Sequence, residues 1–148
     1  MQGELIKIFN WLVANGLTLN LTKTNYVLFH IRRPFPIQID SPFCLNNQPI
    51  SRLTEIKYLG VILDQHLTWI PHINKVKISL SRAYHIIRRL SYIIPPQALI
   101  LTFFSIFHSH LNYATVVWGH VSENKLRPLS SILARAIALV NRVVIGNN

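Results

Sequence analysis

Acidic residues are scarce in this chain. Of its 148 residues, five are Asp or Glu, and no two of these are adjacent. They are Glu4, Asp40, Glu55, Asp64 and Glu123. Two-metal catalysis needs clustered carboxylates that hold two cations about 4 Å apart. The sequence therefore predicts no metal site in this chain.

Cysteine is also nearly absent, since Cys44 is the single one. One cysteine allows neither a disulfide framework nor a cysteine-based zinc site, and it fits a reducing compartment. The histidine pairs His66/His72 and His108/His110 do not have the i, i+4 spacing of a zinc-binding helix. Histidines in the core or on the surface are the simpler interpretation, and no catalytic nucleophile is predicted.

Long uninterrupted apolar runs are missing. Charged residues such as Glu4 break the first segment, residues 1–19, which makes it a poor signal peptide. The most apolar run, Ile93–Val117, contains Pro95 and Pro96 and several polar residues. A membrane span needs about 20 mostly apolar residues. We therefore expect an intracellular protein without a signal peptide or transmembrane segment.

Basic residues are abundant by contrast. Fifteen Lys and Arg give a net charge of +10, and the isoelectric point is near 10.4. This charge is the electrostatic footprint of a nucleic-acid binder, although a basic protein without a specific polyanion has the same composition. Half of the residues are hydrophobic and mean hydropathy is +0.30. The chain can thus build a core, or expose apolar surface to a partner.

The first half of the sequence indicates one helix and several strands. Apolar residues from Leu5 to Val13 follow helical spacing, and Asn15-Gly16 ends that helix. Residues rich in β-branched and aromatic types predict strands, with a turn at 46–49. The predicted strands are Asn25–Ile31, Ile37–Asp40 and Ile56–Leu63.

The second half indicates helices. Six apolar residues spaced three and four apart lie on one stripe, namely Ile73, Val76, Leu80, Ala83, Ile87 and Leu90. A second helix, Ala98–Leu111, is apolar nearly all round, which predicts burial. A third starts near Pro128, with a predicted core face of Leu129, Leu133, Ala136, Val140 and Val143. The predicted fold class is α+β, a helix with a small antiparallel sheet in residues 1–69 followed by a three-helix bundle in residues 70–148.

Five bases of the first of these helices form the candidate binding surface. Lys75, Arg82 and Arg89 recur every seven residues, about 10 Å apart along the axis, and Lys77 and Arg88 lie on another side. No Asp or Glu occurs from residue 73 to 94. The stripe could follow a phosphate backbone without reading bases. An ordinary solvated face is the alternative.

Several short runs occur in an order that resembles a known family. They are Asn15–Asn20, Lys23–Phe29, Lys57–Asp64, Leu67–Trp69 and His72-Ile73. From about Trp11 to Gly146, the chain resembles the C-terminal part of the reverse transcriptase of non-LTR (LINE-type) retrotransposons. That part comprises the end of the palm, the primer grip and the thumb.

The resemblance implies roles for particular residues. Lys23 matches the family's lysine near the leaving pyrophosphate. Tyr58, Leu59, Gly60 and Val61 match the primer-grip hairpin, where a glycine allows another backbone to approach closely. The alternative is a buried core strand in which Gly60 makes room for a helix. Residues 1–69 would be a palm remnant and residues 70–148 a thumb that packs on the template–primer duplex.

The family's metal-binding Asp pair lies upstream of the part that this chain resembles. The resemblance therefore implies a fragment that is inactive alone and holds no cofactor, with Mg²⁺ expected only for the complete polymerase. Its expected partners are an RNA/DNA template–primer duplex and the upstream palm and fingers, with no membrane. The alternatives are a stand-alone basic helical module that binds nucleic acid, a membrane-associated protein that uses Ile93–Val117, and a transposon relic without function.

Overall fold

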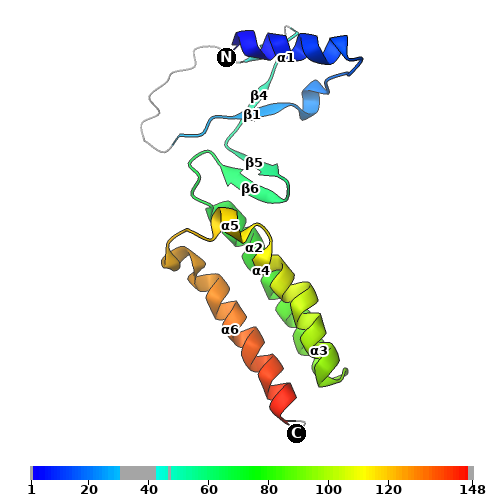
Figure 1. The fold of residues 1–148 in the computed structure, drawn as a ribbon. Coiled ribbons are helices and arrows are strands. Elements are labelled where there is room, and N and C mark those ends of the chain that lie inside the picture. The colour runs from blue at the N-terminus through cyan, green and yellow to red at the C-terminus, as the bar shows by residue number, and fades with distance from the viewer. Residues whose placement is uncertain (1, 31–42, 47, 147–148) are drawn as a thin grey trace. The chain divides into compact units, whose positions relative to one another are not determined.

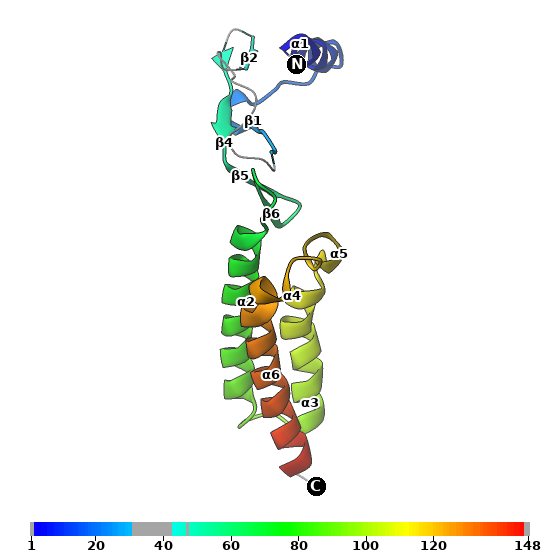
Figure 2. The same cartoon turned by 90° about the vertical axis from the view of Figure 1, so that its left-hand side faces the viewer.

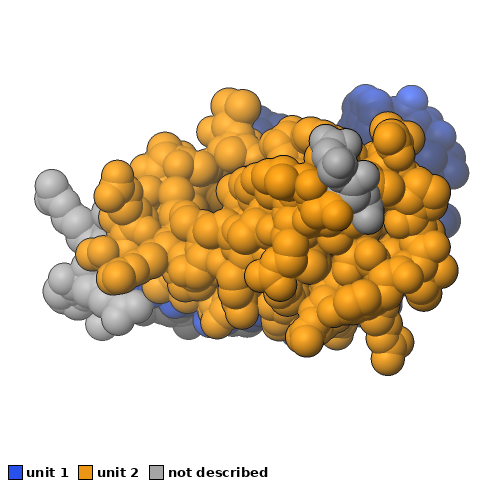
Figure 3. Space-filling view, turned by 90° about the horizontal axis from the view of Figure 1, so that it is seen from below, with its two compact units in different colours: residues 1–67 blue, residues 68–148 orange. Residues whose placement is uncertain are grey.

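The computed structural model describes residues 2–30, 43–46 and 48–146. The chain divides into two compact units, residues 1–67 and 68–148, which are coloured separately in Figure 3. The first unit holds one long helix and short strands, and the second is helical (Figure 1). The α+β prediction is confirmed. The predicted strand Ile37–Asp40 lies outside the described residues.

Helix α1 (Gln2–Ala14) opens the first unit and buries none of its residues. It ends as expected at Gly16, whose φ of +68° is a left-handed conformation that glycine adopts readily. The side chain of Gln2 pairs with the backbone of Cys44, whose N–H donates to Oε1 at 3.2 Å while Nε2 donates to the carbonyl oxygen. These two hydrogen bonds attach the start of α1 to the strand that contains Cys44.

The strands of the first unit pair two by two. They are β1 (Asn25–Val27), β2 (Cys44–Leu45), β3 (Gln48–Pro49), β4 (Ser51–Leu53), β5 (Glu55–Tyr58) and β6 (Val61–Asp64). Within the described residues, β1 pairs with β4 in parallel, whereas β2–β3 and β5–β6 are antiparallel hairpins. The antiparallel prediction thus holds for two of the pairs among the described strands. The short strands form separate pairs and not one sheet, and the β1–β4 pair is parallel.

The predicted strand Ile56–Leu63 is in fact the β5–β6 hairpin, in which Tyr58 pairs with Val61. Leu59 and Gly60 form the connection, with φ values of +44° and +82°. Positive φ at both central residues is the requirement of a type I′ turn, the connection that best matches strand twist. Gly60 therefore reverses the chain and does not leave space in a strand interior.

Helix α2 (Ile70–Leu90) begins the second unit, and its observed core face agrees with the predicted stripe. Its buried residues are His72, Ile73, Val76, Leu80, Ala83 and Ile87. Leu90, the last member of the stripe, is half-buried because it lies in the final turn. His72 is also buried on this face, which apolar periodicity did not predict.

The second helical segment runs through α3 (Pro96–Thr102), the π-helical turn η2 (Phe103–His108) and α4 (Ser109–Asn112). Phe103 and Phe107 are buried and stack at a centroid separation of 5.2 Å. Leu101 and Phe104 are 68% and 54% exposed, so the prediction that this helix is buried all round is wrong. In a unit of three long helices, each helix keeps one face open to solvent.

A short helix, α5 (Thr115–Trp118), leads to the last one, α6 (Glu123–Gly146). Helix α6 starts before the predicted Pro128, which lies inside it. Within the part of the chain that the structure describes, α6 is the helix long and apolar enough to cross a membrane, with 22% of its apolar window buried. The core helix of a soluble bundle meets the same criteria of length and composition.

The three long helical segments lie side by side in both views (Figures 1 and 2). The buried face of α6 consists of Leu129, Ile132, Ala136 and Val140. Of the predicted core positions, Leu133 and Val143 are half-buried instead, whereas Ile132 was not predicted. Leu80, Ile87, Leu99, Phe107 and Ala136 have no exposed surface, which places the core of this unit among α2, α3, η2 and α6.

Candidate nucleic-acid interface

Positive charge is concentrated in the second unit. Residues 68–148 contain nine Lys and Arg against a single acid, Glu123, which gives a net charge of +8. Residues 1–67 contain six bases and four acids, a net charge of +2. A polyanion is therefore attracted mainly to the helical unit.

The five predicted bases of α2 all lie outside its buried stripe. Lys77, Arg82, Arg88 and Arg89 are exposed, whereas Lys75 is half-buried. At 3.6 residues per turn, the row of Lys75, Arg82 and Arg89 lies roughly a third of a turn from the row of Lys77 and Arg88. The two rows thus border one solvent face, which we call the α2 basic face. No acid of α2 interrupts it.

The α2 basic face ends in a surface hollow of about 710 Å³. Its lining residues are His85, Arg88, Arg89, Tyr92 and Ile93. Tyr92 and Ile93 follow the helix directly and are 81% and 77% exposed. Sequence reasoning missed this hollow because a single exposed aromatic residue after a helix forms no periodic pattern.

A base of a neighbouring helix contacts α2. The guanidinium of Arg135 on α6 lies over the ring of Tyr84 on α2, with its central carbon 5.5 Å from the ring centroid. Such cation–π contacts contribute roughly 0.5–1 kcal/mol at exposed sites. Arg135 therefore joins α6 to α2.

The start of α2 is held by an aromatic cluster. The ring of His72 packs edge-on against Trp118 at 5.5 Å, and Trp69 meets His120 at 6.1 Å. Burial lowers the pKa of His72, and the positive charge of Lys75 lowers it further. Trp69 and His72 belong to the runs that resemble reverse transcriptases, and here both are buried packing residues.

Lys23 ends the short helix η1 (Leu21–Lys23), and its side chain is exposed. Its backbone N–H donates to the Asn20 side chain at 3.2 Å, which fixes the turn before β1. Tyr58 and Leu59, at the tip of the β5–β6 hairpin, are 62% and 73% exposed, whereas Val61 is buried. The described strands place β1 and β5 in different sheets, so Lys23 and Tyr58 are not joined by a shared sheet.

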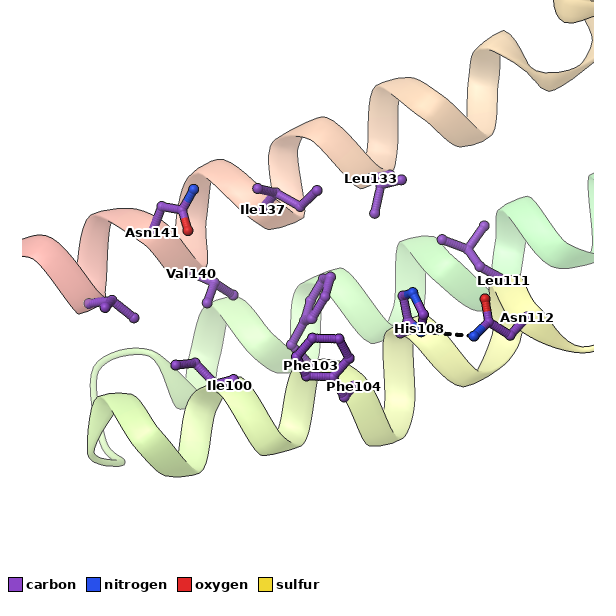
Figure 4. A pocket seen from close by; sticks show the side chains of 11 residues that line it. Ile100, Phe103, Phe104, His108, Leu111, Asn112, Leu133, Ile137, Val140 and Asn141 are labelled. Atoms are coloured by element: carbon purple, nitrogen blue, oxygen red, sulfur yellow. Dashed lines mark hydrogen bonds between the residues drawn. The ribbon is translucent and has the colours of Figure 1, made fainter.

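The helical unit also contains an apolar pocket of about 600 Å³ between α6 and the α3–η2–α4 segment (Figure 4). Apolar side chains such as Phe103, Phe104 and Ile137 line most of it. Its polar groups include His108 and Asn112, which hydrogen-bond to each other at 3.1 Å. Since no Lys, Arg, Asp or Glu lines this pocket, it does not suit a phosphate backbone or a metal ion.

Carboxylates and histidines do not gather into a metal site. No group of three or more His, Cys, Asp or Glu side chains that could hold a metal ion occurs among residues 2–30, 43–46 and 48–146. The cationic α2 basic face and its hollow therefore form the candidate functional surface of the described residues.

Comparison with known proteins gives one informative likeness. No protein-family model matches the chain, and no solved structure matches it. The chain is 22% identical over 144 residues to the "Probable RNA-directed DNA polymerase from transposon X-element" of Drosophila melanogaster. The match covers 95% of this chain but 15% of that protein. The chain is thus distantly related to a short part of a transposon reverse transcriptase.

Proposed function

We propose that this chain is the C-terminal palm, primer-grip and thumb portion of a non-LTR retrotransposon reverse transcriptase. The proposed activity of residues 68–148 is sequence-independent binding to the backbone of a template–primer duplex. The likeness to a transposon RNA-directed DNA polymerase along 95% of the chain is the observation that carries this proposal. The uninterrupted α2 basic face supports it.

The spacing of the bases suits a phosphate backbone. Four of the five are exposed along α2 and Lys75 is half-buried. No acid of the same helix can neutralise them by an i, i+4 pair. Contacts to phosphates position a protein on a duplex but carry no sequence information. Binding through this face should therefore depend strongly on salt and weakly on sequence.

The apolar surface of the first unit supports a missing neighbour. Helix α1 exposes Ile6, Ile8, Trp11 and Val13, each to at least half of its full surface. These residues lie on more than one side of α1, so most of the helix surface lacks an apolar partner within the described residues. Exposed apolar surface marks interaction sites or aggregation liabilities. In the proposed assembly, upstream palm and fingers cover α1, so co-expression of such a fragment should raise the yield of soluble protein.

Titration of a labelled RNA–DNA duplex at several salt concentrations tests the binding proposal. Each phosphate contact contributes a slope of about −0.9 to the plot of log K against log salt. Changing Lys77→Gln and Arg82→Gln together should flatten the slope by up to roughly 2, because two exposed bases leave the α2 basic face. An unchanged slope would remove this face from the proposed interface.

The matched control removes two charges elsewhere. Lys7 pairs with Glu4 on α1, and Arg127 is exposed near the start of α6. Changing Lys7→Gln and Arg127→Gln lowers the net charge by the same amount as the test variant. This control should keep the wild-type slope, and equal losses in both variants would indicate a non-specific effect of net charge.

The same proposal holds that the chain alone does not polymerise nucleotides, since its five acids form no carboxylate pair in sequence. Mg²⁺ and a primed RNA template should therefore give no extended primer with the purified chain. Primer extension by this chain would contradict the proposal, whereas duplex binding without extension agrees with it. A stand-alone basic binding module is the second candidate. It predicts that co-expression of an upstream palm fragment leaves the yield of soluble protein unchanged.

A further inference from the structure

The turn after α2 presents an aromatic ring to solvent from a hydrogen-bonded backbone. Tyr92 is 81% exposed, yet its backbone is held, since its N–H donates to the Arg89 carbonyl at 3.4 Å. The next two amides donate to the carbonyl of Leu90 at 2.9 and 3.0 Å, and the Ser91 hydroxyl donates to the Arg88 carbonyl at 2.8 Å. These bonds hold the backbone from which the Tyr92 side chain projects.

Two arginines share the hollow with this ring. Arg88 and Arg89 occupy the last turn of α2, where cations also offset the helix dipole. The dipole alone would explain their charge, but it does not explain an exposed tyrosine and isoleucine beside them. An exposed aromatic ring together with guanidinium groups is the combination by which proteins bind unpaired nucleotides, through base stacking and phosphate contacts.

We propose that the hollow lined by His85, Arg88, Arg89, Tyr92 and Ile93 binds one unpaired nucleotide of a nucleic-acid strand. The base stacks on Tyr92, and Arg88 and Arg89 contact the adjoining phosphates. The inference rests on the proposed nucleic-acid binding and adds a preference for a duplex with a single-stranded overhang over a blunt duplex. Stacking accepts every base, so the overhang sequence should matter little.

Fluorescence anisotropy with three labelled substrates tests this inference. The substrates are a blunt RNA–DNA duplex, the same duplex with a short single-stranded overhang, and that overhang made of abasic nucleotides. The wild-type chain should bind the base-bearing overhang most tightly. Tyr92→Ala should weaken that binding about tenfold, because loss of stacking on one base has this order of effect, and it should leave the blunt duplex unchanged.

Two further variants identify the source of the effect. Tyr92→Phe keeps the ring and should bind as the wild type does. Tyr113→Ala removes another exposed tyrosine, 54% exposed and located after α4, and should not alter the preference. Because Tyr92 is largely exposed, its replacement should not unfold the unit, and circular dichroism checks this directly.

The possible results separate the two proposals. Equal affinity of the wild-type chain for abasic and base-bearing overhangs overturns the stacking site, as does equal weakening of blunt and overhang binding by Tyr92→Ala. In both cases salt-dependent duplex binding can persist, and the proposed function then stands without this site. Absence of binding to all three substrates overturns both proposals.

Discussion

The two units of this protein differ in how much apolar surface they bury. Fourteen hydrophobic residues are buried in residues 68–148, against three in the described part of residues 1–67. The three are Leu45, Ile50 and Val61. The helical unit therefore has a hydrophobic core of its own, whereas the strand-containing unit buries too few apolar side chains to form one.

The difference follows from the type of secondary structure. Three long helices can bury their apolar faces against each other through short connections. Two-stranded sheets bury little unless a third strand or a helix covers them. Helix α1 meets β2 through Gln2 but buries none of its own residues. Independent stability is thus expected of the second unit only.

Separate expression of the two units should give the largest effect. Residues 68–148 alone should retain a helical circular dichroism spectrum and melt cooperatively, because the buried residues of this unit contact one another. Residues 1–67 alone should show no cooperative transition. A sharp melting transition of the shorter fragment 1–67 would contradict the expectation that only the helical unit is stable by itself.

Truncation of the core tests which side chains give the helical unit its stability. Phe107→Ala should lower the free energy of unfolding by about 3–5 kcal/mol, since Phe107 is fully buried. Phe104→Ala, in the same helical turn but 54% exposed, is the matched control and should cost much less. Urea denaturation measures the free energy of unfolding of both variants. Similar losses in Phe107→Ala and Phe104→Ala would show that burial does not determine how much a side chain contributes to stability.

Acid should destabilise the helical unit through His72. Its folded-state pKa lies below the ordinary value of 6.5, because burial and Lys75 disfavour the charged ring. The unfolded chain then binds more protons, so stability is complete above pH 6.5 and is lost as the pH falls through 6.5 toward the folded pKa. The urea concentration at the midpoint of unfolding should therefore decrease when the pH is lowered from 7.5 to 5.

Replacement of this histidine removes the effect. His72→Gln should make the urea midpoint less dependent on pH, whereas His110→Gln, at an exposed position, should leave the wild-type dependence in place. A pH dependence that persists unchanged in His72→Gln would assign the titration to another group.

The smallest expected change concerns the hairpin of the first unit. Leu59 adopts a φ of +44°, which costs a leucine more than an asparagine. Leu59→Asn creates the Asn-Gly pair preferred in type I′ turns and should stabilise the hairpin by about 0.5–1 kcal/mol. Slower hydrogen exchange at the Val61 amide would report this gain. Gly60→Ala should have the opposite sign, because Gly60 has a φ of +82°.

Sequence periodicity predicted α2 well because burial alone decides which of its residues face inward. Five of the six predicted residues, from Ile73 to Ile87, are buried. Residue types alone predict one strand at Ile56–Leu63, because Leu59 is not a typical turn residue and Gly60 alone does not mark a reversal. The resemblance, by contrast, implies a hairpin at the same place. Pro128 predicts a helix start, since proline favours the first turn, but α6 begins at Glu123.

The candidate interface was predictable in part. The five bases of the α2 basic face follow directly from their spacing, and four of them are exposed as a solvated face requires. The hollow at Tyr92 was not predictable, because it depends on where the chain turns after Leu90. Likewise, the contact between Arg135 and Tyr84 joins residues far apart in sequence. No local pattern encodes such pairs.

The π-helical turn Phe103–His108 has a consequence for tracing the ancestry of this protein. A π turn closes its hydrogen bonds one residue later than an α turn, so it accommodates an additional residue without ending the helix. Relatives with a regular α-helix here should be one residue shorter at this point. Alignments without a gap at Phe103–His108 would then pair one end of the helix with the wrong positions and hide shared descent.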